Sequence, residues 1–231
     1  MSNTSMSETK LMALREAVNL AMSEEMRKDP DIFLMGEDVG IYGGDFGTSV
    51  GMLAEFGEKR VKDTPISEAA IAGAAVGAAI TGLRPIVDLT FMDFITIALD
   101  AIVNNGAKNN YMFGGGLKTP VTFRVASGSG IGSAAQHSQS LESWLTHIPG
   151  IKVVAPGNAN DAKGLLKSSI QDNNIVIFME PKALYGKKEE VTQDPDFYIP
   201  LGKVKSNAKE LTLLLSRMVV CWNVFLRRLK K

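Results

Sequence analysis

Short apolar runs rich in branched side chains alternate along this chain with longer segments of helical periodicity. The runs typical of buried strands are Ile32–Gly36, Pro85–Leu89, Val121–Val125, Ile151–Pro156 and Ile175–Glu180. The segments with a helical pattern are Leu11–Lys28, Ser67–Thr81, Phe94–Asn110, Ser138–Thr146 and Asn160–Asp172. This alternation predicts an α/β fold with a doubly wound, mainly parallel sheet that helices cover on both faces. Ligands bind beyond the carboxyl ends of such strands, so the loops 36–51, 90–93 and 126–136 are expected to form the site.

Composition narrows the class of protein further. Hydrophobic residues make up 45% of the 231 residues and the formal net charge is zero, which gives no whole-chain argument for nucleic-acid binding. The single cysteine, Cys221, excludes an intramolecular disulfide and a cysteine-cluster metal site. The apolar run Ala69–Ile80 is too short to span a bilayer, and the polar N-terminus lacks the core of a secretory signal. We therefore expect a cytoplasmic protein with no nucleic-acid and no membrane partner.

Charge is distributed unevenly along the sequence. Residues 201–231 contain eight Lys or Arg and one Glu, whereas residues 1–200 contain 17 basic and 24 acidic residues, a net charge of 17 − 24 = −7. The last segment has no capped element and no second strand–helix unit. A basic amphipathic helix is one interpretation of it, and a truncated or altered end is the other.

The helical segment from Ser67 to Thr81 is built almost entirely from small residues. Ala69, Gly73 and Gly77 recur at i, i+4 and i+8, which leaves a groove where another backbone can approach closely. Glycine costs about 1 kcal/mol relative to alanine in a helix interior, so a packing gain should offset it. The segment is either an ordinary core helix or the site of a tight subunit contact.

Glu68 is the only ionisable residue in that segment. The helix dipole stabilises a charged carboxylate in the first turn, so Glu68 and Ser67 would then simply cap the helix. Burial against an apolar wall would instead favour the neutral carboxyl, which can donate a hydrogen bond to a ring nitrogen. The local sequence leaves both interpretations open.

His137 lies in AAQHSQS (Ala134–Ser140), after a loop rich in Gly and Ser. The pattern predicts that a helix begins there, and a helix N-terminus disfavours the charged imidazole. A neutral imidazole suits proton transfer or donation to a developing oxyanion. The alternative is a histidine that caps the helix or fills a gap.

Two common site motifs are not supported. GSGIG (Gly128–Gly132) follows a predicted strand, but Ser133 stands where the dinucleotide fingerprint needs its third glycine, so a nicotinamide-binding domain is disfavoured. His137 and His147 are ten residues apart without a second carboxylate–histidine pair, which is a weak pattern for zinc.

Five stretches together resemble one family, in order and spacing. They are GEDVG, FGEKRVKDTPISEAAIAGAAVGAAITGLRPIVD, AAQHSQS, HIPGIKVVAPGNANDAKGLLKSSIQDNN and ALYG. They resemble the β subunit of thiamine-diphosphate-dependent 2-oxo acid dehydrogenases, from about Leu11 to about Gly202. This family includes the pyruvate, branched-chain and acetoin dehydrogenases, and NNGAKNNYMFGGG (Asn104–Gly116) is most similar to the acetoin branch.

The resemblance implies a transketolase-type pyrimidine-binding domain over residues 1–202. Glu68 falls on the glutamate that hydrogen-bonds the aminopyrimidine ring and activates the cofactor, and His137 falls on the histidine that assists acyl transfer. The positions that line the pyrimidine pocket are Glu37, Ile66, Thr90 and Phe94. A potassium site found in some relatives would fall on Val121, Ser169, Ile170, Asp172 and Asn174.

The chain lacks the G-D-G…Asn signature that holds magnesium and diphosphate in this superfamily; GGDFG (Gly43–Gly47) does not match it. The resemblance implies that an α subunit supplies that half, in a heterotetramer with a second β subunit, and that a lipoyl-bearing acyltransferase accepts the acyl group. The chain alone is then not expected to be active. Residues 203–231 would be an aberrant or truncated start of the second domain, so an inactive product with a structural or interaction role is the alternative.

Overall fold

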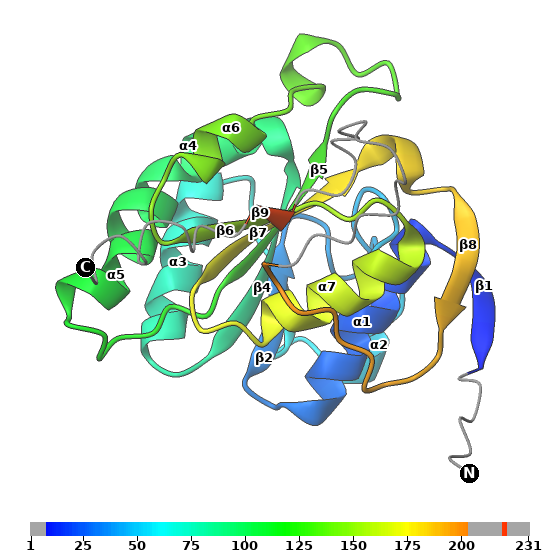
Figure 1. The fold of residues 1–231 in the computed structure, drawn as a ribbon, viewed down its shortest axis with the longest axis horizontal. Helices are drawn as coiled ribbons and strands as arrows, with labels where there is room; N and C mark the ends of the chain where they lie inside the picture. Colours follow the sequence, from blue (N-terminus) through cyan, green and yellow to red (C-terminus); the bar gives the residue numbers. More distant parts are fainter. Residues whose placement is uncertain (1–7, 203–218, 221–231) are drawn as a thin grey trace.

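The computed structural model describes residues 8–202 and 219–220, and its elements alternate between strand and helix for most of that length (Figure 1). The strands are β1 (Thr9–Ala13), β2 (Ile32–Gly36), β3 (Val61–Asp63), β4 (Arg84–Phe91), β5 (Thr122–Ser127), β6 (Ile151–Val154), β7 (Ile175–Pro181), β8 (Lys188–Thr192) and β9 (Val219–Val220). The α-helices are α1 (Leu14–Lys28), α2 (Met52–Phe56), α3 (Glu68–Ile80), α4 (Ile95–Asp100), α5 (Ala107–Met112), α6 (Glu142–Thr146) and α7 (Ala159–Ile170). Short 3₁₀ turns are η1 (Met92–Phe94), η3 (Ala135–His137) and η4 (Lys182–Leu184), and η2 (Ala101–Gly106) is π-helical.

The main sheet has the strand order β3-β2-β4-β5-β7-β6-β9. Every neighbouring pair is parallel except β6 and β9, which run antiparallel at one edge. A separate antiparallel ribbon of β1 and β8 lies at the side of the molecule (Figure 1). The predicted α/β fold with a mainly parallel sheet is confirmed.

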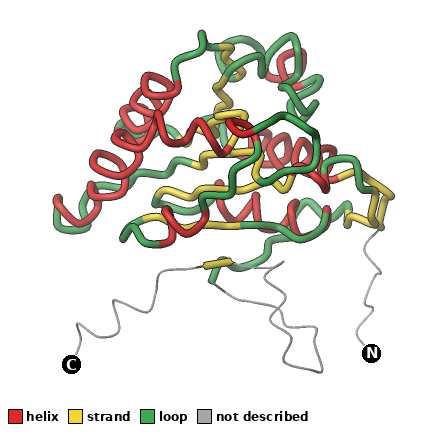
Figure 2. Tube along the Cα trace, turned by 90° about the horizontal axis from the view of Figure 1, so that it is seen from above, coloured by secondary structure: helices red, strands yellow, loops and turns green. Residues whose placement is uncertain are grey.

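Two hydrophobic cores lie on the two faces of the sheet, with helices above and below it (Figure 2). One core packs α1, α2 and α7 against the sheet, and the other packs α3, α4, α5 and α6. Strand residues alternate between the cores: Leu34 belongs to the first and Phe33 to the second. Burial of both faces explains why these strands are continuous apolar runs.

Three boundaries differ from the prediction. Residues 11–13, expected in the first helix, belong to β1, which pairs with β8. The helix expected over Phe94–Asn110 is interrupted by the π-helical η2, whose last residue, Gly106, approaches Ile175 so closely that a β-carbon there would overlap it. The helix expected from Ser138 begins at Glu142. Of the segment 203–231, only β9 lies within the described residues.

Candidate functional site

The carboxyl ends of β2, β4 and β7 meet at one edge of the sheet, and four of the predicted site residues lie in or just beyond strands at that edge. Glu37 directly follows β2, Thr90 is the penultimate residue of β4, and Phe94 ends the η1 turn that follows it. Glu68 begins α3, which follows β3. The topology therefore brings together residues that are up to 57 positions apart (94 − 37 = 57) in the sequence.

Glu68 and Glu37 form a pair of carboxyl groups. Glu68 is 6% exposed, and no hydrogen bond to its carboxylate occurs among the residues that the structure describes. Burial raises the pKa of Glu37, and the charge of Glu68 raises it further, against a backbone hydrogen bond from Ser67. Ser67 itself does not cap α3 with its side chain; its hydroxyl donates to the Pro65 carbonyl at 3.1 Å. Glu68 is therefore buried, as one of the two interpretations requires, and its role in binding a ring nitrogen stays a prediction.

His137 is held by aromatic rings. Its imidazole meets the Phe91 ring edge-on at 4.5 Å and the Phe94 ring edge-on at 5.2 Å between centroids. The expectation that His137 begins a helix is wrong, because η3 is a single turn that ends at His137 and α6 starts only at Glu142. The helix dipole therefore does not act on this ring, and the two phenylalanines orient it instead.

Lys182 contacts the backbone of this histidine and Asp93 contacts Gln139, two residues further along, and sequence reasoning missed both. The Lys182 ammonium donates to the His137 carbonyl and lies 5.0 Å from the centre of the Phe91 ring. Burial lowers the pKa of Lys182, and the charge of Asp93 opposes this shift. Asp93 is 4% exposed, and its Oδ1 accepts a 2.8 Å hydrogen bond from Gln139 Nε2. Asp93 Oδ2 is buried without a hydrogen-bond partner in the described part of the chain, so a polar acceptor remains unsatisfied beside the site.

A buried ion cluster lies beneath the site, on the three central strands. Arg124 of β5 makes a two-point contact with Glu180 of β7, at 2.7 Å from Nε and 3.0 Å from an Nη, and contacts Asp88 of β4 at 3.1 Å. Burial would lower the pKa of Arg124, but the charges of Glu180 and Asp88 outweigh it and raise that pKa. Tyr185 donates to Glu180 at 2.8 Å. The signal available in the sequence was an ionisable residue inside an otherwise apolar buried strand.

Asp88 connects this cluster to the pocket wall. Its Oδ1 accepts a 2.9 Å hydrogen bond from the backbone N–H of Thr90, which has φ = 58°. A β-branched residue in the left-handed region is strained, and such strain concentrates at functional sites. The hydrogen bond to Asp88 on β4 therefore helps to hold Thr90 in this conformation.

Apolar side chains on the loops around this edge are left open. Ile66 is 82% exposed, Ile41 is 89% exposed and Tyr42 is 79% exposed. A 2.6 Å hydrogen bond from the Gly40 N–H to Asp63 ties together the loops that carry them. Ile66 thus does not reach a pocket wall formed by this chain alone, and neighbouring exposed apolar side chains of this size indicate a surface for a partner.

The five residues of the expected potassium site lie at the opposite edge of the sheet, near the amino ends of β5 and β7. Arg84 already donates to two of the carbonyls, that of Ile170 at 2.9 Å and that of Asp172 at 2.9 Å. Lys152 pairs with the Asp172 carboxylate. A potassium ion there would have to share the Ile170 and Asp172 carbonyl oxygens with the Arg84 guanidinium. The potassium site stays a prediction.

Other candidate sites can be assessed within the described residues. Gly47–Gly51 has the spacing G-x-S-x-G, but Ser49 is fully buried and its hydroxyl donates to the Val39 carbonyl at 2.8 Å, so it is not presented as a nucleophile. No group of three or more His, Cys, Asp or Glu side chains in residues 8–202 is placed to hold a metal ion. None of the helices described is long and apolar enough to cross a membrane.

The parallel sheet with its site at the carboxyl edge defines the class to which the chain can be assigned. Residues 10–188 match the family described as transketolase, pyrimidine binding domain, and the chain belongs to this family. A solved structure with the same fold is a split-gene transketolase, described as an inactive β4 tetramer, with a TM-score of 0.64 at 22% identity over 84% of this chain and 58% of that one.

Two relatives show which members the chain is similar to. It is 50% identical over 205 residues to the pyruvate dehydrogenase E1 component subunit beta of Rhizobium meliloti, covering 88% of this chain and 45% of the relative. It is 47% identical over 218 residues to the acetoin:2,6-dichlorophenolindophenol oxidoreductase subunit beta of Bacillus subtilis, covering 88% of this chain and 64% of the relative. The chain thus spans about half to two thirds of these two proteins, which are subunits of enzymes.

Proposed function

We propose that this chain is the pyrimidine-binding part of the β subunit of a thiamine-diphosphate-dependent 2-oxo acid or acetoin dehydrogenase. The observation that carries the proposal is Glu68, a carboxyl-bearing residue only 6% exposed, near Glu37 at the carboxyl edge of the sheet. At the same edge Asp93 Oδ2 is buried without a hydrogen-bond partner in the described residues, and such an atom is expected to meet a ligand or water. The similarity to β subunits of pyruvate and acetoin dehydrogenases supports the same assignment.

The residues present fit the pyrimidine half of thiamine diphosphate. Phe94 offers a half-buried aromatic surface for a flat ring, and the strained backbone at Thr90 brings a main-chain segment to the same edge. Glu37 and Ile66 would border the ring from the adjacent loops. When bound, the cofactor supplies the electron sink for cleavage of the bond next to a carbonyl.

Glu68 would hold a proton at its carboxyl oxygen and donate it in a hydrogen bond to a ring nitrogen of the pyrimidine. Glu68 is 6% exposed, so its carboxyl could make this contact in a site from which most water is excluded. The positive charge that a protonated ring would carry is also favoured by the Glu37 carboxylate.

His137 would donate a hydrogen bond to the substrate oxygen while the acyl group passes to lipoamide. Phe91 and Phe94 fix the plane of its ring, and Lys182 fixes its backbone carbonyl, so the imidazole is oriented before substrate arrives. Preorganised donors of this type stabilise developing negative charge without reorganisation.

The partners proposed are an α subunit, a second β subunit and a lipoyl-bearing acyltransferase. The α subunit would hold magnesium and the diphosphate, and would cover the exposed Ile41, Tyr42 and Ile66. The second β subunit would pack on the small-residue face of α3, where Gly73 and Gly77 have nothing within 4 Å of an added β-carbon. Substrate remains open between pyruvate, a branched-chain 2-oxo acid and acetoin, and location in the cytoplasm remains a prediction.

Co-expression with the α subunit of the same dehydrogenase tests the proposal. The assembled pair should reduce a dye with one of these three substrates only when thiamine diphosphate and magnesium are present. Glu68→Ala should abolish this activity while the complex still forms. A stable complex that is inactive with all three substrates would support the alternative, a truncated product with a structural or interaction role, and failure of the two chains to associate would contradict the enzyme-subunit proposal.

A further inference from the structure

The β1–β8 ribbon has an edge that the rest of the described chain does not use. Its register pairs Thr9 with Thr192, Lys10 with Val191 and so on to Ala13 with Lys188. The Gln193 N–H donates to the Glu8 carbonyl at 2.8 Å. Since hydrogen-bonded and non-hydrogen-bonded pairs alternate in an antiparallel ladder, residues 8, 10 and 12 direct their N–H and C=O groups toward β8.

The intervening residues of β1 direct their backbone groups outward. The Ala13 N–H confirms this geometry, because it donates to the Glu16 carboxylate at 2.6 Å rather than to β8. On the far side of β8, the Thr192 N–H likewise points away from β1 and donates to Asn160 at 3.0 Å. The N–H and C=O groups of Thr9 and Leu11 have no hydrogen-bond partner among the described residues, so β1 presents a free strand edge.

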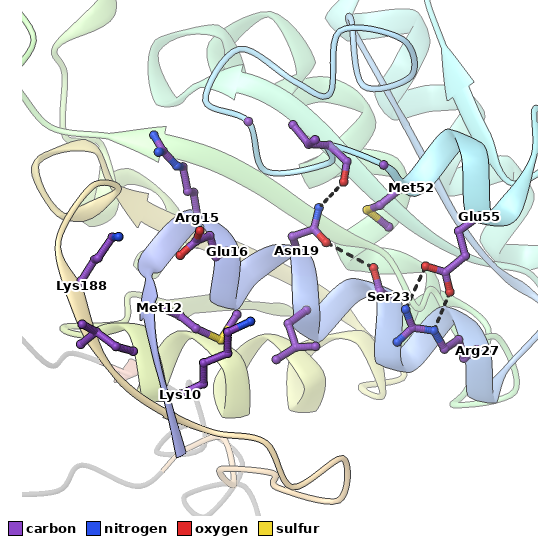
Figure 3. Close-up of a pocket in the computed structure, with 15 residues that line it drawn as sticks. Lys10, Met12, Arg15, Glu16, Asn19, Ser23, Arg27, Met52, Glu55 and Lys188 are labelled. Carbon is purple, nitrogen blue, oxygen red and sulfur yellow. Dashed lines mark hydrogen bonds and ion pairs between the residues drawn. The ribbon is translucent and has the colours of Figure 1, made fainter. Parts of the chain in front are cut away.

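This edge borders a groove of about 660 Å³ that runs beside α1 (Figure 3). Lys10 and Arg15 line one end, and an ion pair between Arg27 and Glu55 at 2.5 Å closes the other. From Arg15 to Arg27 a helix rises about 18 Å, which is the length of roughly five or six extended residues. The groove follows α1, so only the end at Lys10 and Arg15 meets the β1 edge.

The charge of the groove is opposite to that of its surroundings. The lining has four basic residues and two acidic ones, Glu16 and Glu55, a net charge of 4 − 2 = +2, whereas the chain up to residue 200 has a net charge of −7. Lys10, Arg15 and Lys188 are exposed and make no ion pair within residues 8–202. The C-terminal 31 residues carry eight basic residues and one acidic residue, so they would be repelled. A second copy would bring the same lysines to the same edge.

We propose that an extended, acidic segment of a partner protein adds to the outer edge of β1. Its backbone pairs with Thr9 and Leu11, its acidic side chains meet Lys10, Arg15 and Lys188, and an apolar side chain covers Leu11, which is 62% exposed. Main-chain pairing supplies affinity in this mode of recognition, and the flanking charges select the partner. This surface is separate from the carboxyl-edge site and does not depend on the chemistry proposed there.

Binding of a defined peptide to the 231-residue chain tests the selectivity. The probe is a fluorescein-labelled eight-residue peptide that alternates Glu with Val or Thr. The control peptide has the same sequence with Lys in place of each Glu. Pairs between the peptide carboxylates and Lys10, Arg15 and Lys188 should give the acidic peptide a Kd roughly tenfold lower than that of the control peptide. Fluorescence anisotropy measures both Kd values, and the difference should shrink at high salt. The double variant Lys10→Glu, Lys188→Glu should reverse the preference, and the exposed control Lys118→Glu should leave it unchanged.

Amide exchange, measured at a saturating concentration of the acidic peptide, tests the backbone pairing directly. The Thr9 and Leu11 amides should exchange rapidly in the free chain and at least about tenfold more slowly with the acidic peptide, whereas Lys10 and Met12 should be protected throughout. An acidic peptide N-methylated at every second residue, on the amides that face β1, should lose binding. A peptide N-methylated on the other set of amides, which face away from β1, should keep it. Equal binding of both peptides, or unchanged exchange at Thr9 and Leu11, would overturn the proposal. If sedimentation shows a dimer of the free chain and the Thr9 and Leu11 amides are protected in that dimer, the proposal would be overturned in favour of a second copy.

Discussion

Glu37 lies at the carboxyl end of β2 near the Glu68 carboxyl. In this position the ionised form of Glu37, which dominates at neutral pH, reduces the stability of the folded chain. Burial and the charge of Glu68 raise the pKa of Glu37 above its value in the unfolded chain. A carboxyl group with a raised folded-state pKa contributes stability below its unfolded pKa, near 4, and that contribution is lost as the pH rises through the folded pKa.

Glu37→Gln should therefore stabilise the folded chain at pH 7 to 8. Because Glu37 is partly exposed, the gain should be modest, about 1–3 °C in Tm, and it should vanish below about pH 4, where the wild-type carboxyl is protonated. Thermal unfolding followed by circular dichroism across this pH range measures it. A Tm gain that is the same at pH 4 and pH 8 would contradict the assigned cause.

Beneath the site, Arg124 and Glu180 depend on each other. Removing the Glu180 charge leaves the buried Arg124 with only its 3.1 Å contact to Asp88, so Glu180→Gln should cost about 3 kcal/mol of unfolding free energy. Tyr185→Phe, which removes only the 2.8 Å hydrogen bond to Glu180, is the matched control and should cost about 1–2 kcal/mol. Urea unfolding measures both variants, and equal losses would show that the ion pair does not hold the central strands.

The elements that the sequence predicted best are those buried on both faces. Residues 32–36 and 175–179 are apolar throughout, and the structure has β2 over Ile32–Gly36 and β7 over Ile175–Pro181. The short edge strands β1, β3 and β8 were missed, because exposed strands carry no apolar run. The π-helical turn Ala101–Gly106 was missed because its side-chain pattern over one turn does not differ from that of an α-helix.

The site was predictable in part for the same reason. The topology of a parallel sheet places the loops after β2 and β4 together, so loops 36–51 and 90–93 could be assigned to one edge, and the family resemblance selected Glu37, Thr90 and Phe94. Asp93 and Lys182 could not, because their roles depend on which side chain each one contacts across the fold. The aromatic support of His137 was hidden by the wrong assumption that it begins a helix.

The small-residue face of α3 gives a prediction at the level of this element. Nothing lies within 4 Å of a β-carbon added at Gly77, so Gly77→Ala should stabilise the isolated chain by up to about 1 kcal/mol. If this face is the contact with a second β subunit, the same methyl group should weaken assembly. Unfolding of the chain and sedimentation of the complex with the α subunit measure the two effects.

Gly150→Ala is the opposite control. Gly150 has φ = 95°, and a β-carbon there would overlap the Ala107 carbonyl oxygen, so the substitution should destabilise the chain by about 1–3 kcal/mol. A Gly77→Ala variant that is more stable and yet assembles with full affinity would exclude the glycine face as a subunit contact.

At the scale of the whole molecule, the described residues contain a framework that is complete and a site that is not. The sheet has helices on both faces, and two hydrophobic cores fill the space between them. At the carboxyl edge, by contrast, the buried Asp93 Oδ2 has no hydrogen-bond partner in the described residues and large apolar side chains are exposed. These properties are expected when a second chain supplies the other wall of the site.

Ile66→Glu tests this arrangement because Ile66 is 82% exposed and immediately precedes the first turn of α3. An exposed substitution of this kind should change the unfolding free energy of the chain by no more than about 0.5 kcal/mol. In the complex it would bury an unpaired charge, so association with the α subunit should weaken by roughly 100-fold or more. Ile97→Glu, on a 52% exposed side chain of α4, is the control for a general effect of surface charge. Titration calorimetry of each variant with the α subunit measures the difference, and unchanged affinity for Ile66→Glu would place the α subunit on another surface.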